Sequence, residues 1–230
     1  MGFEGFVNNT WYDADNVMYN RFVNLDGVED KILYYLISPQ EKNEEQLALV
    51  HSIWRLLKYN DDHALINDEE HPLPTYKEVT KLIDNNGVDQ TGKRIFRYPL
   101  IEDTFVEQCS QIRIYVDSIF PVNHLVSTVC FGVEIIIHNK IVNILNNLYN
   151  EKDLPNNPTE FKPLVTYKNR STVLLKDILG LLNGADIAGV GKLIYSQELS
   201  ATAQSRIGLW NNRNFFGYKT IFACQMSGVA

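Results

Sequence analysis

Two neighbouring β-rich runs constrain the fold of this chain more than any other feature of its sequence. Residues 112–117 alternate apolar and polar side chains, as a strand with one buried face does. The longer run Val126–His138 repeats large apolar side chains at every second position. Between the two runs, residues 120–123 include the proline and asparagine typical of a turn. The sequence therefore predicts an antiparallel strand pair at the centre of a sheet.

Helical patterns dominate the part of the chain that precedes these runs. An Asp-x-x-Glu capping box at Asp26 predicts a helix over residues 28–37. A stripe of apolar residues predicts a second helix over residues 43–59, so that the two helices form a hairpin. Another capping box at Thr75 predicts a short helix over residues 76–84.

A further helix and more strands are expected after the β-rich pair. Ser171 can cap a helix that ends at Asn183-Gly184, because glycine is favoured where a chain turns left-handed. The remaining segments are predicted as strands at residues 94–98, 190–195 and 217–226 and as a loop at residues 146–163. The expected fold is α+β, a mainly antiparallel sheet flanked by helices with an N-terminal helical segment. We divide the chain into a helical N-terminal segment, residues 1–90, and an α+β core domain, residues 91–230.

The stretch NGADIAGVGK, residues 183–192, is similar to a glycine-rich phosphate loop but fails its chemical requirements. A P-loop needs glycine where Asp186 stands and a serine or threonine where Leu193 stands. The dinucleotide-binding pattern needs a third glycine where Ile194 stands. The stretch also leads from a helix into a strand, the reverse of a P-loop. We therefore predict a hinge between helix and strand, with Lys192 pointing to the surface or to a neighbour.

Charge and cysteine content exclude several classes of protein. Lys and Arg total 21 against 28 Asp and Glu, a formal charge of -7, and no segment clusters cations with aromatics. Binding to nucleic acid through its phosphates is therefore disfavoured. No apolar run reaches the roughly 20 residues that span a bilayer, and the first residues lack the basic start and apolar core of a signal peptide, so a cytoplasmic protein is expected. The three cysteines, Cys109, Cys130 and Cys224, are expected to be reduced and buried.

The polar residues 60–71 contain the groups most suited to holding a divalent metal. Carboxylates and imidazoles are possible ligands, and a metal-dependent, nuclease-like enzyme would use Asp61, Asp62, His63, Glu69 and His71. The stretch lacks the spacing of a calcium loop and the helical His-x-x-x-His of a zinc site. We expect a solvated surface loop instead, and no bound metal, cofactor or catalytic residue. Glu134 and His138, on one face of a strand, are interpreted as a structural pair.

The order of segments after residue 94 resembles that of another class of protein. The relevant stretches are RIFRYPLIEDTFVEQCSQIRIYV, STVCFGVEIIIHNKIV, NRSTVLLKDILGLLNG, IAGVGKLIYSQ and FFGYKTIFACQMSG. Together they resemble neck and tail-terminator proteins, the head-tail connectors of long-tailed bacteriophages, over residues 94–228. In that family a strand hairpin precedes a helix with an early arginine, here Arg170. A short strand follows, and then a last strand that begins near an aromatic-glycine-aromatic triplet, here Phe216-Gly217-Tyr218.

The resemblance implies a structural virion protein that forms a ring at the head-to-tail junction and caps the tail. The implied partners are further copies in a sixfold ring and neighbouring neck, tail tube or sheath proteins. DNA would pass through without sequence-specific binding, and assembly would occur in the host cytoplasm. A soluble adaptor that binds a protein partner through the hairpin around Trp54 is the other alternative. The predicted interface residues are Trp54, Arg170, Lys192, Phe216 and Tyr218.

Overall fold

A mixed but mainly antiparallel sheet forms the centre of the protein in the computed structural model, which describes residues 27–84, 91–99, 107–123, 126–148, 165–202, 207–208 and 214–227. The strand order is β1-β2-β3-β10-β8, and β9 also pairs with β10. Every pairing is antiparallel except that of β1 with β2. The strands are β1 (Ile95–Phe96), β2 (Ser110–Pro121), β3 (Val126–His138), β8 (Ile194–Tyr195), β9 (Ile207–Gly208) and β10 (Phe215–Ser227). The predicted antiparallel pair is β2 with β3, and β3 is central to the sheet.

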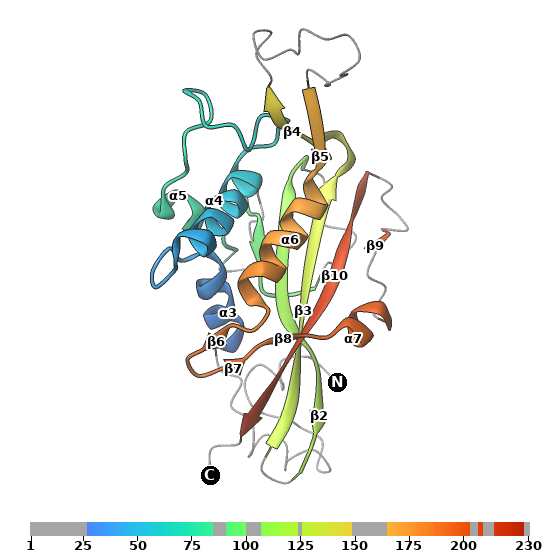
Figure 1. The fold of residues 1–230 in the computed structure, drawn as a ribbon. Helices are drawn as coiled ribbons and strands as arrows, with labels where there is room; N and C mark the ends of the chain where they lie inside the picture. The colour runs from blue at the N-terminus through green and yellow to red at the C-terminus, as the bar shows by residue number, and fades with distance from the viewer. Residues whose placement is uncertain are drawn as a thin grey trace, which may run out of the picture.

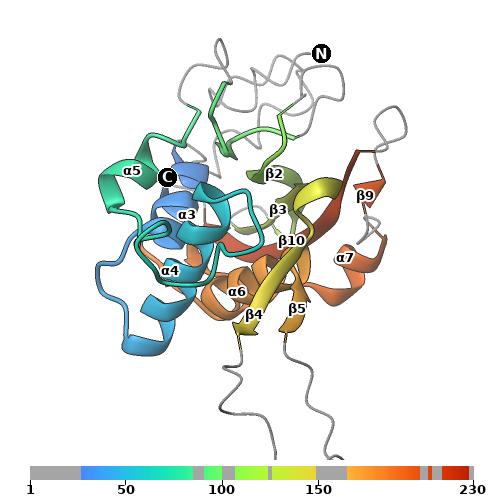
Figure 2. The ribbon, with the colours of Figure 1, turned by 90° about the horizontal axis from the view of Figure 1, so that it is seen from above.

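Helices cover one face of this sheet, as Figure 2 shows for α3, α4 and α6. The helices are α3 (Val28–Ile37), α4 (Glu44–Lys58), α5 (Tyr76–Thr80), α6 (Arg170–Leu182) and α7 (Gln197–Thr202), with a 3-10 turn η3 (Asn139–Ile141). The α+β fold predicted from the sequence is therefore confirmed. Within the described part of the chain, no helix has the length and apolar character needed to cross a bilayer.

One hydrophobic cluster joins the helices to the sheet. It contains buried side chains from α3 and α4, such as Ile32 and Ile53, together with Ile114 and Val133 from the sheet and Leu174 from α6. Burying an aliphatic side chain of this size stabilises a fold by roughly 1.5–3 kcal/mol. The helices of the predicted N-terminal segment therefore share their core with the strands that follow.

Three predicted helix boundaries differ from the structure. The residue that precedes α3 is Gly27, in the left-handed region with φ 63 and no side-chain cap, while Asp26 lies outside the described residues. Helix α6 is capped by Asn169, whose side chain accepts hydrogen bonds from the N–H groups of Ser171 and Thr172, so Ser171 lies inside the helix. Helix α5 has the predicted capping box but ends at Thr80. The chain then straightens, because Ile83 forms a bridge with Ile95.

Two small hairpins lie apart from the main sheet. Strands β4 (Asn143–Leu148) and β5 (Val165–Asn169) pair where a loop was predicted to begin, and residues 149–163 of that loop lie outside the described residues. Strands β6 (Asp186–Ile187) and β7 (Gly191–Lys192) pair with each other, so the predicted strand over residues 190–195 is divided between β7 and β8. In Figure 1 the β4–β5 hairpin lies at the upper end of the protein, and the turn between β2 and β3 lies at the lower end.

The three cysteines are free and buried, as predicted. Burial raises the pKa of Cys109 to about 11 and that of Cys224 to about 12, and it raises the pKa of Cys130 as well. We therefore expect the folded protein to resist labelling by a disulfide reagent such as DTNB at about pH 8, because the reactive species is the exposed thiolate. Unfolding in guanidinium should release all three thiols. Rapid labelling of the native protein would contradict this placement.

Candidate functional site

A buried arginine organises the beginning of the acidic loop, residues 60–71. The guanidinium of Arg170, with 0% exposure, donates to the carbonyls of Leu56 (3.0 Å), Tyr59 (2.7 Å) and Asp61, and its Nε donates to Ile141 (2.8 Å). Three of these carbonyls follow or belong to the last turn of α4, where helical partners are missing and the helix dipole favours a cation. Burial lowers the pKa of Arg170 to about 10, so the side chain stays charged at neutral pH.

A second buried arginine holds the remainder of the loop against α4. Arg55 donates through Nη1 to the carbonyls of Ile66 (3.1 Å) and His71 (2.8 Å) and through Nη2 to Asn67 Oδ1 (2.5 Å). The backbone of Asp62 also accepts a hydrogen bond from the N–H of Leu145 in β4, at 2.7 Å. The acidic loop is therefore fixed to α4, α6 and the β4–β5 hairpin.

His71 joins two carboxylates within this loop. Its Nε2 lies 2.8 Å from Asp61 Oδ2 and its Nδ1 lies 3.1 Å from Asp68 Oδ1. Both ring nitrogens can donate only when the imidazole is protonated. The hydrogen bond with Asp61, together with that to Asp68, raises the pKa of His71 above its usual value. The loop is thus held most firmly when His71 carries a charge.

This arrangement predicts a pH-dependent contribution to stability. Because the pKa of His71 is higher in the folded than in the unfolded protein, its contribution is complete below the unfolded value and is lost as pH rises through the folded value. The urea midpoint of the native protein should exceed that of His71→Gln at about pH 6, and the difference should shrink by about pH 9. A difference independent of pH would contradict a charged His71.

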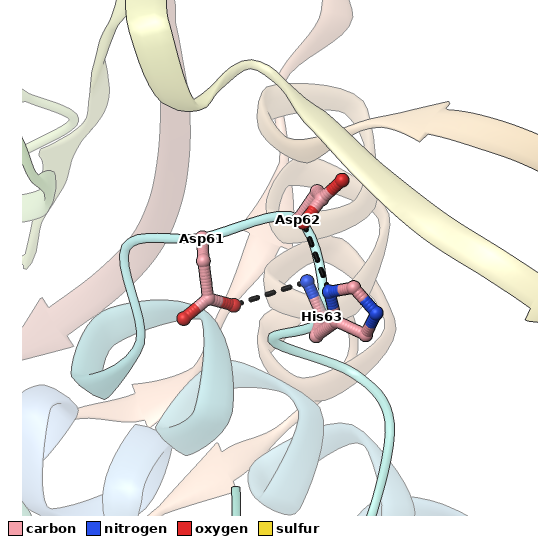
Figure 3. A group of neighbouring side chains, drawn as sticks. All are labelled: Asp61, Asp62 and His63. Atoms are coloured by element: carbon pink, nitrogen blue, oxygen red, sulfur yellow. Dashed lines mark hydrogen bonds and ion pairs between the residues drawn. The ribbon is translucent and has the colours of Figure 1, made fainter. Parts of the chain in front are cut away.

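Three neighbouring side chains of the loop form a possible metal-binding group. Ligand atoms of Asp61, Asp62 and His63 lie within 4.8 Å of one another. Figure 3 shows both carboxylates facing His63, with Asp62 Oδ1 3.0 Å from the imidazole Nδ1 and Asp61 Oδ1 accepting from the backbone N–H of His63 at 3.0 Å. Of the five residues named for a metal-dependent enzyme, His71 contacts Asp61 through a hydrogen bond, and Glu69 is exposed and outside the group. The carboxylates thus have internal hydrogen-bond partners.

A row of charged residues crosses the opposite face of the sheet, and sequence analysis missed it. Arg113 lies beside Glu134, which lies beside Lys219, in the register of β2, β3 and β10. Tyr115 Oη donates to Glu134 at 2.5 Å, and Lys219 Nζ lies 2.6 Å from Asp117. The alternation of residues along each strand indicated that these positions share one face of the sheet. It did not indicate that this face would be largely buried. Opposite charges paired across strands favour the observed register.

The predicted pairing of Glu134 with His138 is wrong. Residues four apart in a strand are separated by roughly 13 Å. His138 instead accepts a hydrogen bond at Nδ1 from the N–H of Lys140, and its ring packs edge-on against Phe215. Glu134 accepts from Tyr115, as described above. Both residues are buried structural residues with separate partners.

The stretch NGADIAGVGK links helix to strand, as predicted. Gly184, Gly189 and Gly191 have φ values of 84, 75 and 100, a region that favours glycine. These residues end α6 and form the turn of the β6–β7 hairpin. Lys192 is exposed at the end of that hairpin. The segment has a conformational role in the fold.

Comparison with known families assigns the chain to one of them. The model of the YomW family matches residues 51–224, which is more than half of the chain. The chain belongs to the YomW family. This name derives from a Bacillus phage, and the YomW chain is accordingly a phage-associated protein. No curated protein and no solved structure matches it.

The matched YomW region contains every residue predicted for an interface, but two of them are not available at the surface. Trp54 is 4% exposed and donates from Nε1 to the carbonyl of Ile37 at 3.0 Å, while Arg170 is enclosed by the carbonyls described above. Both side chains make their contacts inside the protein. The prediction that Trp54 and Arg170 lie at an interface is therefore wrong. Lys192 is exposed, and Phe216 and Tyr218 are half-buried on β10, so their role at an interface stays a prediction.

Proposed function

We propose that this YomW-family protein is a structural component of a phage neck or tail terminator and forms a ring at the head-to-tail junction. The observation that carries the proposal is the order of elements. The β2–β3 hairpin is followed, after the β4–β5 hairpin, by α6 with Arg170 as its first residue, and then, after the β6–β7 hairpin, by the short strand β8. The last strand, β10, begins at the Phe216-Gly217-Tyr218 region and returns to β3 at the centre of the sheet. This is the order expected of neck and tail-terminator proteins.

Exposed apolar side chains at two separate places support assembly into a ring. Phe120 and Val122, at the β2–β3 turn, are 48% and 55% exposed, and Tyr167 on β5 is 58% exposed. The end of the β2–β3 hairpin and strand β5, which carry these residues, lie toward opposite ends of the protein in Figure 1. A ring needs two different surfaces on each copy, because each subunit contacts its neighbours head to tail. Exposed apolar side chains toward opposite ends suit that geometry.

The charge of the protein suits a conduit for DNA. A formal charge of -7 gives a surface that repels a polyanion on average. DNA could then pass through the ring without being held, since strong binding requires clustered cations. We propose a role without catalysis, in which the partners are further copies in a sixfold ring and adjoining neck, tube or sheath proteins.

Gold-labelled antibodies against the protein, imaged on purified phage particles, test this proposal. Label at the junction of head and tail is the expected result. An antibody against a major capsid protein provides the control, because it should decorate the whole head. Particles that lack the protein, or that carry it elsewhere, would overturn the proposal.

A further inference from the structure

Helix α6 carries two buried ionisable side chains that contact α4, the helix beside it in Figure 1. Arg170, the first residue of α6, donates to carbonyls at the end of α4, as described above. Asp177 follows about two helical turns later, on the same side of α6. It is 5% exposed, and its Oδ2 accepts a hydrogen bond from Ser52 Oγ of α4 at 2.6 Å. The contact between the two helices therefore contains a buried cation and, further along, a buried carboxyl group.

The two groups differ in how their charge is compensated. The guanidinium of Arg170 is surrounded by carbonyl oxygens, which carry partial negative charge. The carboxyl group of Asp177 has the neutral hydroxyl of Ser52 as its donor, and none of the ion pairs in the described part of the chain includes it. Burying a carboxylate without a paired cation costs free energy, because protein replaces its water. Asp177 is therefore costly to bury when it is ionised.

The charges that act on Asp177 come from two lysines. Lys176 on α6 and Lys168 on β5 favour the ionised carboxylate, but both side chains are exposed, so solvent screens them. Helix α3 and strands β3, β8 and β10 also contact α6, and they contribute apolar side chains such as Val133 to the shared core. Burial therefore outweighs the hydrogen bond from Ser52 and the two lysines, and it raises the pKa of Asp177 to about 6.

We propose that Asp177 and Ser52 form a pH-sensitive contact between α4 and α6, which tightens when Asp177 is protonated and loosens when Asp177 ionises. A neutral, hydrogen-bonded carboxyl group is buried at a much lower cost than a carboxylate. The effect extends to the acidic loop, because α6 also carries Arg170, which donates to the carbonyl of Asp61. The contact lies within one chain, so its pH dependence does not require the proposed ring.

The direction of the effect follows from proton linkage. The pKa of Asp177 is raised in the folded protein above its ordinary value of 3.8. Its contribution to stability is therefore complete below about pH 4 and is lost as pH rises through about 6. Asparagine can still accept the hydrogen bond from Ser52 but carries no charge at any pH. Relative to the native protein, Asp177→Asn should therefore gain stability as pH rises.

Urea unfolding of the full-length native protein and of Asp177→Asn, from about pH 4 to about pH 8, tests the contact. The ratio of the two unfolding constants cancels the groups that both proteins share, His71 among them. Between about pH 4 and pH 7 this ratio should change at least about tenfold in favour of the variant, because one pKa unit corresponds to a factor of ten. Asp186→Asn, at an exposed position on β6, is the matched control, and its ratio should change little. A ratio for Asp177→Asn that is independent of pH overturns the proposal.

Ser52→Ala tests the hydroxyl without a change at Asp177. The hydrogen bond from Ser52 favours the ionised carboxylate, so its removal should destabilise the protein more at about pH 8 than at about pH 4. Equal losses at both pH values would mean that the hydroxyl does not act on the charge of Asp177. Hydrogen exchange at about pH 7 should show the amides of α6 better protected in Asp177→Asn than in the native protein. Equal protection would contradict a contact that loosens on ionisation.

Discussion

Replacing Arg170 by methionine should lower the free energy of unfolding by about 3–4 kcal/mol, one of the two largest effects expected for a single substitution. Methionine fills much of the volume but donates no hydrogen bond. The carbonyls of Leu56, Tyr59 and Ile141 would then lose their donor in a buried setting, where each unpaired polar group costs roughly 1–3 kcal/mol. Urea unfolding followed by tryptophan fluorescence measures the loss.

Arg97→Met is the matched control for this prediction. Arg97 forms an ion pair with Asp30 at 2.8 Å and donates to the carbonyl of Asp84 at 3.3 Å, but the ion pair is partly exposed. An exposed pair contributes roughly 0–1 kcal/mol and a single hydrogen bond roughly 0.5–1.5 kcal/mol, so this variant should lose clearly less stability than Arg170→Met. Equal losses of stability from Arg170→Met and Arg97→Met would contradict the role assigned to Arg170, which is to cap the end of α4 from a buried position.

Gly217→Ala should prevent the protein from folding or cost more than about 4 kcal/mol. A Cβ at this position would lie 1.7 Å from the carbonyl oxygen of Ile135 and 3.1 Å from the Cα of Ile136. Both neighbours are backbone atoms of β3, so they cannot rotate away as a side chain could. The pairing of β10 with β3 would have to open where Gly217 faces Ile136. Yield of soluble protein and urea unfolding report the effect.

Gly180→Ala is the matched control, because it makes the same replacement of glycine by alanine at a position without a backbone clash. A Cβ at Gly180 would meet only the Cδ1 atom of Leu49, at 2.9 Å, and that side chain can shift. Alanine is favoured over glycine inside a helix by up to about 1 kcal/mol, so stability should be unchanged or slightly higher. Normal folding of Gly217→Ala would contradict the close approach of β10 to β3.

Local patterns of the sequence were sufficient to predict most of the elements. The alternation in Val126–His138 identified β3, and the apolar stripe before Tyr59 identified α4. Partners distant in sequence were not predictable in this way. The ends of α5 and the division between β7 and β8 depend on pairing with Ile95 and with β10, which no local window contains. Tertiary pairing therefore decided the boundaries that the sequence left open.

The candidate site was less predictable than the fold. Arg170 was predicted to lie at an interface, but its guanidinium is buried against the end of α4, 109 to 114 positions earlier in the chain. Trp54 was predicted to lie at an interface because its contacts with Ile37 and Tyr76 could not be read from the sequence.

The mass of the purified full-length protein in solution, measured by light scattering over a range of concentrations, tests the central claim most directly. The proposed ring predicts a discrete assembly of about six times 26.4 kDa that electron microscopy shows as closed and symmetric. A single chain of 26.4 kDa at every concentration, absent from phage particles, would contradict the account.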